Sequence, residues 1–488
     1  MNASYILLTV VIYFLLLCLI SRIMGGKGDN DAFFRGNRRS PWWAVAFGMV
    51  GASVSGVSFV SVPGMIITEN MTYMQMCVGF FLGYLVVAFV LLPLYYRLKL
   101  TSIYTYLDLR FGRMAYRTGA SFFLLSKMLG AAARLYIVCL ILQQYVFGGM
   151  GIPFVVTAVA TVFLIWLYTF RSGIRSLVWT DALQTLCLMV ALVWMVYELC
   201  RLNGFSLNEA WHFVQSSPYS QWIEWNEWSS PRHFVKQFLS GIFIVIVMTG
   251  LDQDMMQKNL TCKNLRDAQK DMCTYGFVFI PLNYLLLALG VLLLTLASKE
   301  GIPVPSRGDD LLPLFCAEGY LGKGVLVLFT IGIIAAAFSS ADSALTALTT
   351  TFCVDILDVE RKFASPERVR KRVHALLALC FIGFILLFEK VNNSSVIVAV
   401  FVMASYTYGP LLGLFGFGLF TKRMPDSRMV PLVCVLAPLG CYVLDSLSQA
   451  CWGYKFGYEL LLLNGLLTFG GLWCFSREGS KIKMEAPK

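Results

Sequence analysis

Apolar positions along the chain gather into long runs, and short polar segments separate one run from the next. Runs of about 18 or more mostly apolar residues recur over the whole length, and each can cross roughly 30 Å of hydrocarbon as a helix. The pattern therefore predicts an all-α, polytopic membrane protein. We expect thirteen spans, at 5–24, 42–67, 71–97, 119–147, 152–170, 177–200, 234–256, 272–298, 322–355, 372–390, 394–421, 430–447 and 456–475.

Composition supports this prediction. Apolar residues make up 58% of the chain and charged residues 14%, against about 25% charged in a typical soluble domain. The first run, 5–24, has no basic residue before it and no clear small-residue cleavage site, so we expect a helix rather than a signal peptide.

The basic residues predict the orientation. Of the 39 Lys and Arg, 29 fall in 22–41, 97–118, 171–176, 257–271, 356–373, 421–428 and the C-terminal tail, and 8 fall in the alternate loops. Because Lys and Arg collect in cytoplasmic loops, we expect the N-terminus outside and the C-terminus inside, in the plasma (inner) membrane. The net charge of +11 is explained by these loops, so we expect no nucleic-acid partner.

Several function classes are disfavoured. The fourteen cysteines form no CxxC pair, and the three histidines lie in loops or near helix ends, which favours buried structural thiols over zinc or disulfide sites. No His/Glu metal motif or Ser/His pair lies within a span, so we expect no enzyme activity and no organic cofactor. The chain ends 13 residues after the last span, which counts against a membrane sensor, and no obligatory protein partner is evident.

The second span is rich in small and polar residues. Residues 48–64 contain four glycines, a proline and four serines in the sequence GMVGASVSGVSFVSVPG. Such a helix unwinds easily, and unwound backbone survives in a membrane where protein or a wet cavity satisfies it. Broken helices of this kind offer carbonyl oxygens to ions. Close packing of helices through small residues is the alternative interpretation.

The ninth span carries hydroxyl groups on one face. Ala336, Ser339, Ser340, Ser343 and Ala347 recur at helical spacing. A hydroxyl-bearing face suits a hard cation such as Na⁺, by extension from the oxygen preference of Mg²⁺ and Ca²⁺. Packing is again the alternative.

Acidic residues also occur within or at the rim of spans. Asp181 and Asp342 lie inside spans six and nine, and intramembrane carboxylates are functional candidates because insertion costs about 2.5–3.5 kcal/mol. Asp252 and Asp254 lie near the inner end of span seven, where we expect solvation to explain them.

Two cations share one face of span four. Lys127 and Arg134 are seven residues apart, and Arg134 lies about 24 Å along the span, too deep for easy snorkelling. We expect Arg134 either to pair with an internal acid or to meet an anionic solute through its planar guanidinium.

Four segments resemble the sodium:solute symporter family, whose members carry sugars, amino acids, monocarboxylates, iodide, vitamins and sialic acids. They are LTSIYTYLDLRFG (100–112), SGIRSLVWTDALQ (172–184), DQDMMQKNL (252–260) and AAAFSSADSALTALTT (335–350). Ser172 replaces a glycine that is usual in the family, and Lys258 replaces an arginine.

The resemblance implies a leucine-transporter-like fold with two five-helix repeats of inverted topology. The implied divisions are 1–41 (extra N-terminal helix and cytoplasmic loop), 42–200 (first repeat), 201–233 (extracellular loop), 234–421 (second repeat) and 422–488 (two C-terminal helices and tail).

The resemblance also implies a Na⁺ site between spans two and nine. Its ligands would be the carbonyls of Gly51, Val54 and Ala336 and the hydroxyls of Ser339 and Ser340.

Some members of the family hold a second Na⁺. Asp181, Ser339 and Ser343 match its ligands, but Asp342 stands where those members have serine, which leaves this site open.

The predicted function is Na⁺-coupled symport of a small organic solute by alternating access, with Na⁺ as the coupling ion. Depth along the spans places the solute candidates at Ser55, Ser58, Ser61, Gln75, Arg134, Met248, Thr249 and Tyr406 or Tyr408. Arg134 favours a carboxylate-bearing solute, such as a monocarboxylate or a sugar acid. The alternatives are a H⁺-coupled transporter of the same fold, with Asp181 or Asp342 as the proton carrier, and a transporter-like membrane sensor.

Overall fold

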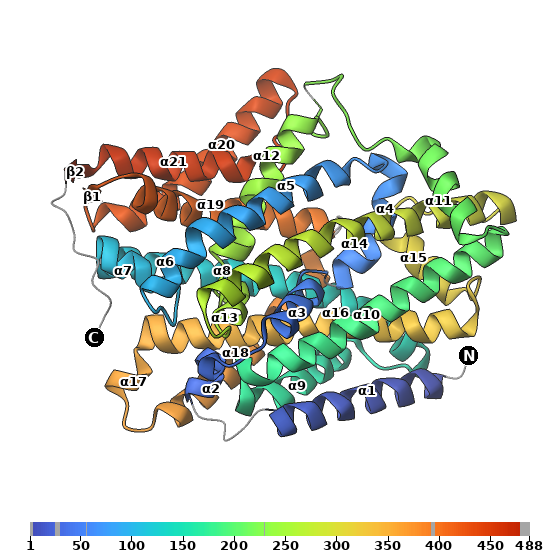
Figure 1. Ribbon diagram of the computed structural model, residues 1–488, viewed down its shortest axis with the longest axis horizontal. Helices are drawn as coiled ribbons and strands as arrows, with labels where there is room; N and C mark the ends of the chain where they lie inside the picture. Colours follow the sequence, from blue (N-terminus) through green and yellow to red (C-terminus); the bar gives the residue numbers. More distant parts are fainter. Residues whose placement is uncertain (1–2, 25–29, 55, 229, 392–395, 479–488) are drawn as a thin grey trace.

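The computed structural model describes residues 3–24, 30–54, 56–228, 230–391 and 396–478. In this part of the chain nearly all regular structure is helical (Figure 1). The helices of the first half are α1 (Ala3–Met24), α2 (Asn30–Arg35), α3 (Trp42–Ser53), α4 (Gly56–Glu69), α5 (Tyr73–Val86), α6 (Leu92–Arg97), α7 (Thr105–Phe111), α8 (Arg113–Leu142), α9 (Phe154–Ser172), α10 (Ile174–Asn203) and α11 (Leu207–Ser216).

The second half continues in the same way. Its helices are α12 (Phe234–Val245), α13 (Gln253–Asn259), α14 (Leu265–Glu300), α15 (Leu311–Ala317), α16 (Gly322–Thr351), α17 (Val359–Lys362), α18 (Pro366–Val391), α19 (Val396–Phe420), α20 (Met429–Trp452) and α21 (Leu460–Cys474). Short π-helical turns cover Val87–Leu91, Gln143–Phe147, Ile246–Gly250 and Phe352–Leu357. The short 3₁₀ turns cover Gly36–Arg38, Gly148–Met150, Pro218–Ser220 and Gly308–Asp310.

The all-α prediction is confirmed, and each of the thirteen expected segments contains helix. By length and composition, the described residues contain seven helices able to cross a membrane, or up to nine if two bent pairs each count as one span. Shorter apolar helices cover Val11–Met24, Phe154–Phe170 and Leu460–Cys474. The number thirteen therefore stays a prediction.

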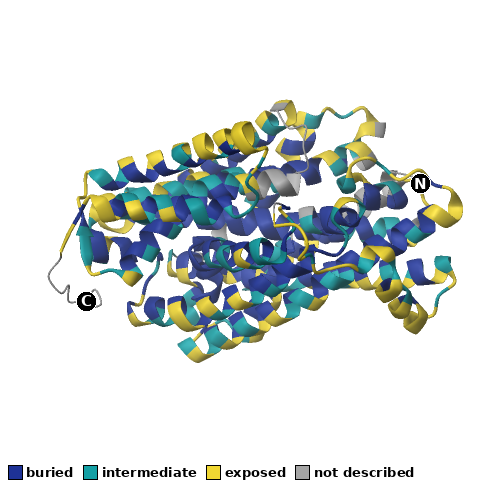
Figure 2. Ribbon diagram, turned by 90° about the horizontal axis from the view of Figure 1, so that it is seen from above, coloured by how far each residue is buried: buried dark blue, intermediate teal, exposed yellow. Residues whose placement is uncertain are grey.

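The outer surface of the bundle is apolar. On α20, a stripe of side chains that includes Leu436 (53% exposed) and Leu439 (55% exposed) faces outward, and exposed positions line the margins of the molecule while buried ones fill its centre (Figure 2). A soluble protein rarely exposes large continuous apolar patches. This surface is the one expected where hydrocarbon replaces water as the solvent.

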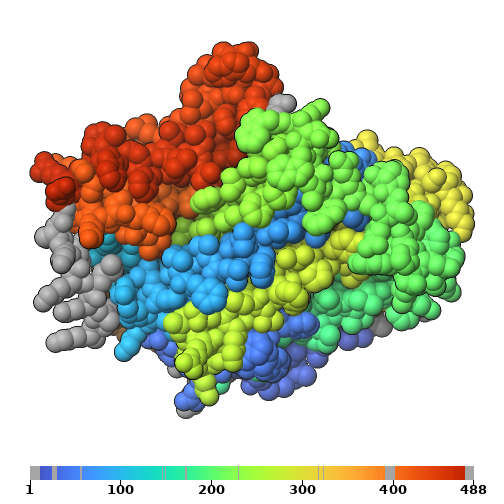
Figure 3. Space-filling model, turned by 45° about the horizontal axis from the view of Figure 1, so that its top comes forward, coloured from blue at the N-terminus to red at the C-terminus, as the bar shows by residue number. Residues whose placement is uncertain are grey.

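Helices from both halves of the chain lie side by side. The strip formed by α5 and α6 runs between α12 and α14 on the visible face (Figure 3). The helices α3, α8 and α13 lie near the centre, whereas α1 and α21 lie at opposite margins (Figure 1). The central helices carry the polar residues discussed below.

Two short strands were not predicted. Strand β1 (Arg423–Pro425) pairs antiparallel with β2 (Ser476–Glu478). They join the chain just before α20 to the chain just after α21, and Arg423 donates to both the hydroxyl and the carbonyl of Ser476 at 2.8 Å. Strands of three residues leave almost no periodic signal in a sequence.

Candidate sodium and solute sites

The helix of the second span is interrupted, as its composition predicts. Helix α3 ends at Ser53 and α4 begins at Gly56, and the two axes differ by 53°. The last carbonyls of α3 therefore lack the amide partners of a continuing helix. One of them is met by another helix, because the Ser340 hydroxyl on α16 donates to the Ala52 carbonyl at 3.2 Å.

Glycines let α3 pack closely against α10. A Cβ atom on Gly51 would lie 1.9 Å from Oγ1 of Thr185, and one on Gly48 would lie 3.0 Å from Cβ of Asp181. Close packing, the alternative interpretation of this segment, is therefore also present. The segment therefore has both roles, since its glycines bring α3 close to α10 and its break leaves the Ala52 carbonyl to accept from α16.

The proposed Na⁺ ligands lie on segments that meet at this break. A Cβ atom on Gly56 would lie 3.4 Å from the Ile333 carbonyl oxygen, so α16 passes directly beside the gap. Val54 and Ala336 are both buried, and the donor set is made of carbonyl and hydroxyl oxygens only. Oxygen ligands without a soft donor fit a hard cation, so the residues present suit Na⁺.

The candidate ligands of the second Na⁺ are bound to other protein groups. Asp181 accepts from the Ser339 hydroxyl at 2.7 Å through Oδ1, and its Oδ2 lies 2.8 Å from Nζ of Lys258. Asp342 accepts from the Tyr168 hydroxyl at 2.6 Å. The single hydroxyl proton of Ser343 is shared between the Ser339 carbonyl, at 2.8 Å, and the Asp254 carboxylate, at 3.3 Å.

Lys258 was missed by the sequence analysis, which counted it among the basic residues of a cytoplasmic loop. It is 1% exposed and lies on α13. A buried ammonium requires a carboxylate partner, and Asp181 supplies one from α10, in the other half of the chain. A single lysine in a loop-like segment gives no signal of such a partner.

A second break, which was not predicted, interrupts the seventh span. The segment Phe234–Gly250 and α13 meet at an angle of 69°. Asp252 caps α13, because its side chain accepts from the amide of Asp254 at 2.8 Å. The sequence Thr-Gly-Leu-Asp, residues 249–252, with an N-cap residue shortly after a glycine, is the signal that could have indicated this break.

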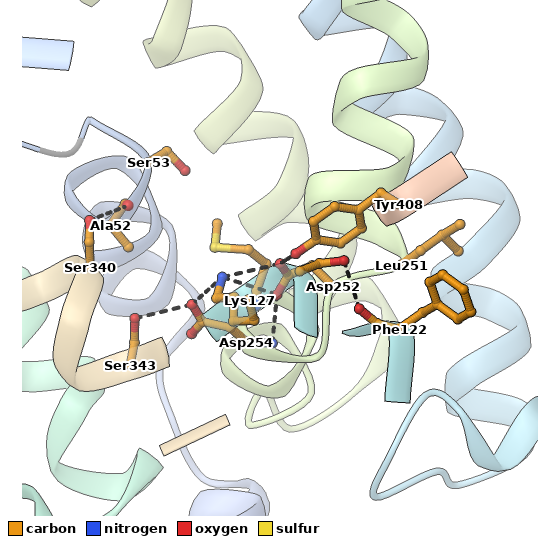
Figure 4. A network of polar contacts seen from close by, with 12 residues as sticks. Ala52, Ser53, Phe122, Lys127, Leu251, Asp252, Asp254, Ser340, Ser343 and Tyr408 are labelled. Carbon is orange, nitrogen blue, oxygen red and sulfur yellow. Dashed lines mark hydrogen bonds and ion pairs between the residues drawn. The ribbon is translucent and has the colours of Figure 1, made fainter. Parts of the chain in front are cut away.

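The expectation that solvent explains Asp252 and Asp254 was wrong. They are 1% and 4% exposed, and Nζ of Lys127 lies 3.1 Å from Asp252 and 2.7 Å from Asp254 (Figure 4). The Tyr408 hydroxyl donates to Asp252 at 2.6 Å. The bend carries α13 into the bundle, so these carboxylates meet a cation inside the protein instead of water.

A cavity of about 120 Å³ lies beside both breaks. It is lined by Ala52, Ser53, Ser58, Tyr73, Phe80, Tyr84, Lys127, Arg134, Ile244, Val245, Met248, Thr249, Asp252, Asp254, Met255, Tyr275, Phe279 and Ser340. The lining combines hydroxyls, aromatic rings and charges, as expected of a site for a polar organic molecule.

Among the predicted solute residues, Ser58, Arg134, Met248 and Thr249 lie on the cavity wall. Arg134 forms no ion pair or hydrogen bond with any residue that the structure describes, whereas Lys127, about two turns earlier on the same face of α8, forms two ion pairs. The internal pair considered for Arg134 is formed by Lys127 instead, and Arg134 lines the cavity.

The other predicted solute residues do not line this cavity. Gln75 is fully buried and binds the Arg232 carbonyl at 3.0 Å and the Glu224 amide at 3.0 Å, so it holds the 201–233 segment against α5. Ser61 is buried outside the wall, and Tyr408, not Tyr406, approaches the charged cluster. Ser55 lies outside the described residues.

Family membership is shown by a sequence match that covers most of the chain. The sequence model of the sodium:solute symporter family matches residues 33–428. This chain belongs to that family.

Curated relatives within the family cover nearly the whole chain. The sodium/sialic acid symporter SiaT of Proteus mirabilis is 25% identical over 454 residues, which are 90% of this chain and 89% of that protein. The sodium/sialic acid symporter NanT of Aliivibrio fischeri is 25% identical over 425 residues, 83% of this chain and 81% of that protein.

Solved structures confirm the expected symporter fold. A substrate-bound, outward-open Na⁺-coupled sialic acid symporter superposes with a TM-score of 0.80 at 21% identity and covers 97% of this chain and 99% of that one. The nucleobase-cation-symport transporter Mhp1 in a closed conformation gives 0.55 at 14% identity, covering 91% and 94%. The leucine-transporter-like architecture predicted for this symporter is therefore present.

Proposed function

We propose that this chain is a Na⁺-coupled symporter of a small carboxylate-bearing solute, with a sugar acid as its best candidate. Arg134 carries the proposal, because it lines the cavity and forms no ion pair with any carboxylate that the structure describes. A guanidinium forms paired hydrogen bonds with a carboxylate in a fixed geometry. A solute carboxylate would provide that partner.

The rest of the wall supports a polyhydroxylated solute. Ser58 and Thr249 contribute hydroxyls, and Tyr84 and Tyr275 share a hydrogen bond of 2.7 Å at the edge of the cavity. Sialic acids, which the relatives SiaT and NanT are named for, are acids of this type. A simple monocarboxylate would use Arg134 but would make no hydrogen bonds to these hydroxyls.

Na⁺ bound between α3 and α16 would couple to this cavity. Its proposed ligands are Gly51, Val54, Ala336, Ser339 and Ser340, and Ser340 also lies on the cavity wall. An ion that holds the broken helix against α16 stabilises the conformation in which the wall is complete. Because coupling free energy is reciprocal, the solute would tighten Na⁺ binding by the same factor.

We further propose the predicted orientation and the two repeats, 42–200 and 234–421. The orientation rests on the distribution of Lys and Arg among the loops. The repeats are supported by the position of the two bends, of 53° and 69°, in the first span of each. Discontinuous helices at corresponding positions of two repeats are typical of secondary transporters.

The test is uptake into proteoliposomes of labelled N-acetylneuraminic acid, pyruvate and a neutral sugar, each with an inward gradient of Na⁺ or of H⁺. We expect uptake of the sugar acid that requires Na⁺. Arg134→Gln should abolish it, and Arg201→Gln is the control because Arg201 is an exposed arginine paired with Glu198. Uptake driven by H⁺ alone, or unaffected by Arg134→Gln, would contradict the proposal.

A further inference from the structure

We propose that Tyr275 is a positioning residue that links solute binding to Na⁺ binding, because its hydroxyl holds the end of α3 on which proposed Na⁺ ligands lie. The inference rests on the proposed function and concerns how its two sites influence each other. Tyr275 lies on α14 and lines the cavity, and it is not among the proposed ligands of the ion.

The hydroxyl of Ser53 is bound by Tyr275. Ser53 is the last residue of α3, and its hydroxyl forms a hydrogen bond with the Tyr275 hydroxyl. Among the residues that the structure describes, the Ser53 hydroxyl has no other hydrogen-bond partner. Val54, which follows, leaves the helical conformation with a φ of −78° and a ψ of 74°. The bond therefore fixes α3 at the point where its helix stops.

Tyr275 can fix this point because its own side chain is held in place. It is 1% exposed, and Tyr84 on α5 donates to its hydroxyl at 2.7 Å, which leaves the single phenolic proton of Tyr275 for Ser53. The centroids of the two tyrosine rings lie 4.4 Å apart. Gly276 permits this approach, since a Cβ atom there would lie 2.7 Å from Cδ2 of Tyr84. The anchor thus comes from α5 and α14, which are separate from the helix that it holds.

The segment that Tyr275 holds belongs to both proposed sites. The carbonyls of Gly51 and Val54, on either side of Ser53 in the chain, are proposed Na⁺ ligands. Ser53 and Tyr275 also line the solute cavity. A displacement of Ser53 would therefore move the ligands of the ion and the wall of the cavity together.

This arrangement gives each ligand an influence on the other. A solute seated against the wall restricts the Ser53–Tyr275 pair, and the neighbouring carbonyls of the same backbone become ordered with it. Once one ligand has ordered this segment, the second binds without that entropic cost, and the effect is equal in both directions. Without the Tyr275 hydroxyl, the end of α3 would move independently of the wall, and the two ligands would bind independently.

The test measures the dissociation constant of ²²Na⁺ for the purified full-length protein, with and without saturating N-acetylneuraminic acid. The ratio of the two constants is the coupling factor. We expect a factor of about ten for the wild type and about two or less for Tyr275→Phe, which keeps the ring and removes the hydroxyl. Ser53→Ala removes the same bond from α3 and should give the same loss, and the double variant should lose no more than either single variant.

Tyr96→Phe is the matched control. The Tyr96 hydroxyl lies outside the cavity lining and is shared between the carbonyls of Asn259 and Cys262, each at 3.2 Å. Its removal also takes a phenolic hydroxyl from a structural hydrogen bond, so it can lower the thermal unfolding midpoint. The coupling factor of Tyr96→Phe should nevertheless equal that of the wild type.

Three outcomes would overturn the inference. A folded Tyr275→Phe protein with the wild-type coupling factor would do so, and if that variant does not fold, a Ser53→Ala protein with the wild-type factor would do so in its place. An equal loss of coupling in Tyr96→Phe would show that the effect is one of stability. Failure of the proposed function looks different, since the wild-type protein itself would then show a factor of one and take up solute without regard to Na⁺, which would remove the basis of the inference as well.

Discussion

Nζ of Lys127 on α8 lies 2.7 Å from a carboxylate oxygen of Asp254 on α13, and both side chains are less than a tenth exposed. The same ammonium lies 3.1 Å from a carboxylate oxygen of Asp252, and Asp252 also accepts a hydrogen bond from the Tyr408 hydroxyl on α19. This cation and its two carboxylates thus connect three helices at the cavity wall. Such a cluster stabilises this arrangement of the three helices only while it is complete.

Lys127→Met should destabilise the protein by about 3–5 kcal/mol, because it leaves two buried carboxylates without a cation. The measurement is the thermal unfolding midpoint of the purified protein in detergent. Lys127→Arg keeps the charge and is the matched control. Adding Asp254→Asn to Lys127→Met should recover part of the loss, and a double variant no more stable than the single one would contradict this account.

Ser340→Ala should raise the Na⁺ concentration that gives half-maximal uptake by about tenfold, equivalent to about 1.4 kcal/mol for one lost oxygen ligand. Thr161→Ala is the control, since the Thr161 hydroxyl is equally buried but donates to the Thr157 carbonyl of its own helix. Unchanged Na⁺ dependence in Ser340→Ala would remove α16 from the proposed ion site.

Gly51→Ala should impair folding and uptake by overpacking, at a cost of about 1–3 kcal/mol. The added methyl would lie 1.9 Å from Oγ1 of Thr185, so α3 would be pushed away from α10. Combining it with Thr185→Ala should restore part of the stability. Gly383→Ala on α18 is the control: a Cβ atom at this position would have no other atom within 4 Å, so the variant should behave like the wild type. An equal loss of stability in Gly383→Ala would contradict the overpacking explanation for Gly51→Ala.

Gln75→Ala should lower stability without changing the preference among solutes. Its side chain satisfies the Glu224 amide and the Arg232 carbonyl, and leaving buried groups unpaired costs about 1–3 kcal/mol each. The measurement compares the unfolding midpoint with the ratio of KM values for two solutes. A changed KM ratio at unchanged stability would return Gln75 to the solute site, where the sequence had placed it.

The sequence predicted those features that are carried by composition within one segment. The glycines and serines of residues 48–64 indicated a break, and the break is present. The apolar runs predicted the helices, and short motifs identified the symporter family. Each of these signals lies within one short segment, so a single amino-acid sequence is enough to detect it.

Contacts between distant segments could not be predicted in this way. Lys258 and Asp181 are 77 residues apart along the chain, and Lys127 is 125 residues from Asp252. Helical periodicity gives the face of a side chain but not the helix that it meets. The carboxylates at the second bend were therefore assigned to solvent, and Lys258 was assigned to a loop.

The β1–β2 ladder closes one end of the helical pair α20–α21, with Arg423 fastened to Ser476 and lying over the Trp473 ring at 4.8 Å. The opposite end is linked by the short stretch between Trp452 and Leu460, which begins at Gly453 with a φ of +65°. Because the strands hold this end of the two helices together, any separation of α20 from α21 must open near Gly453 rather than at the strands.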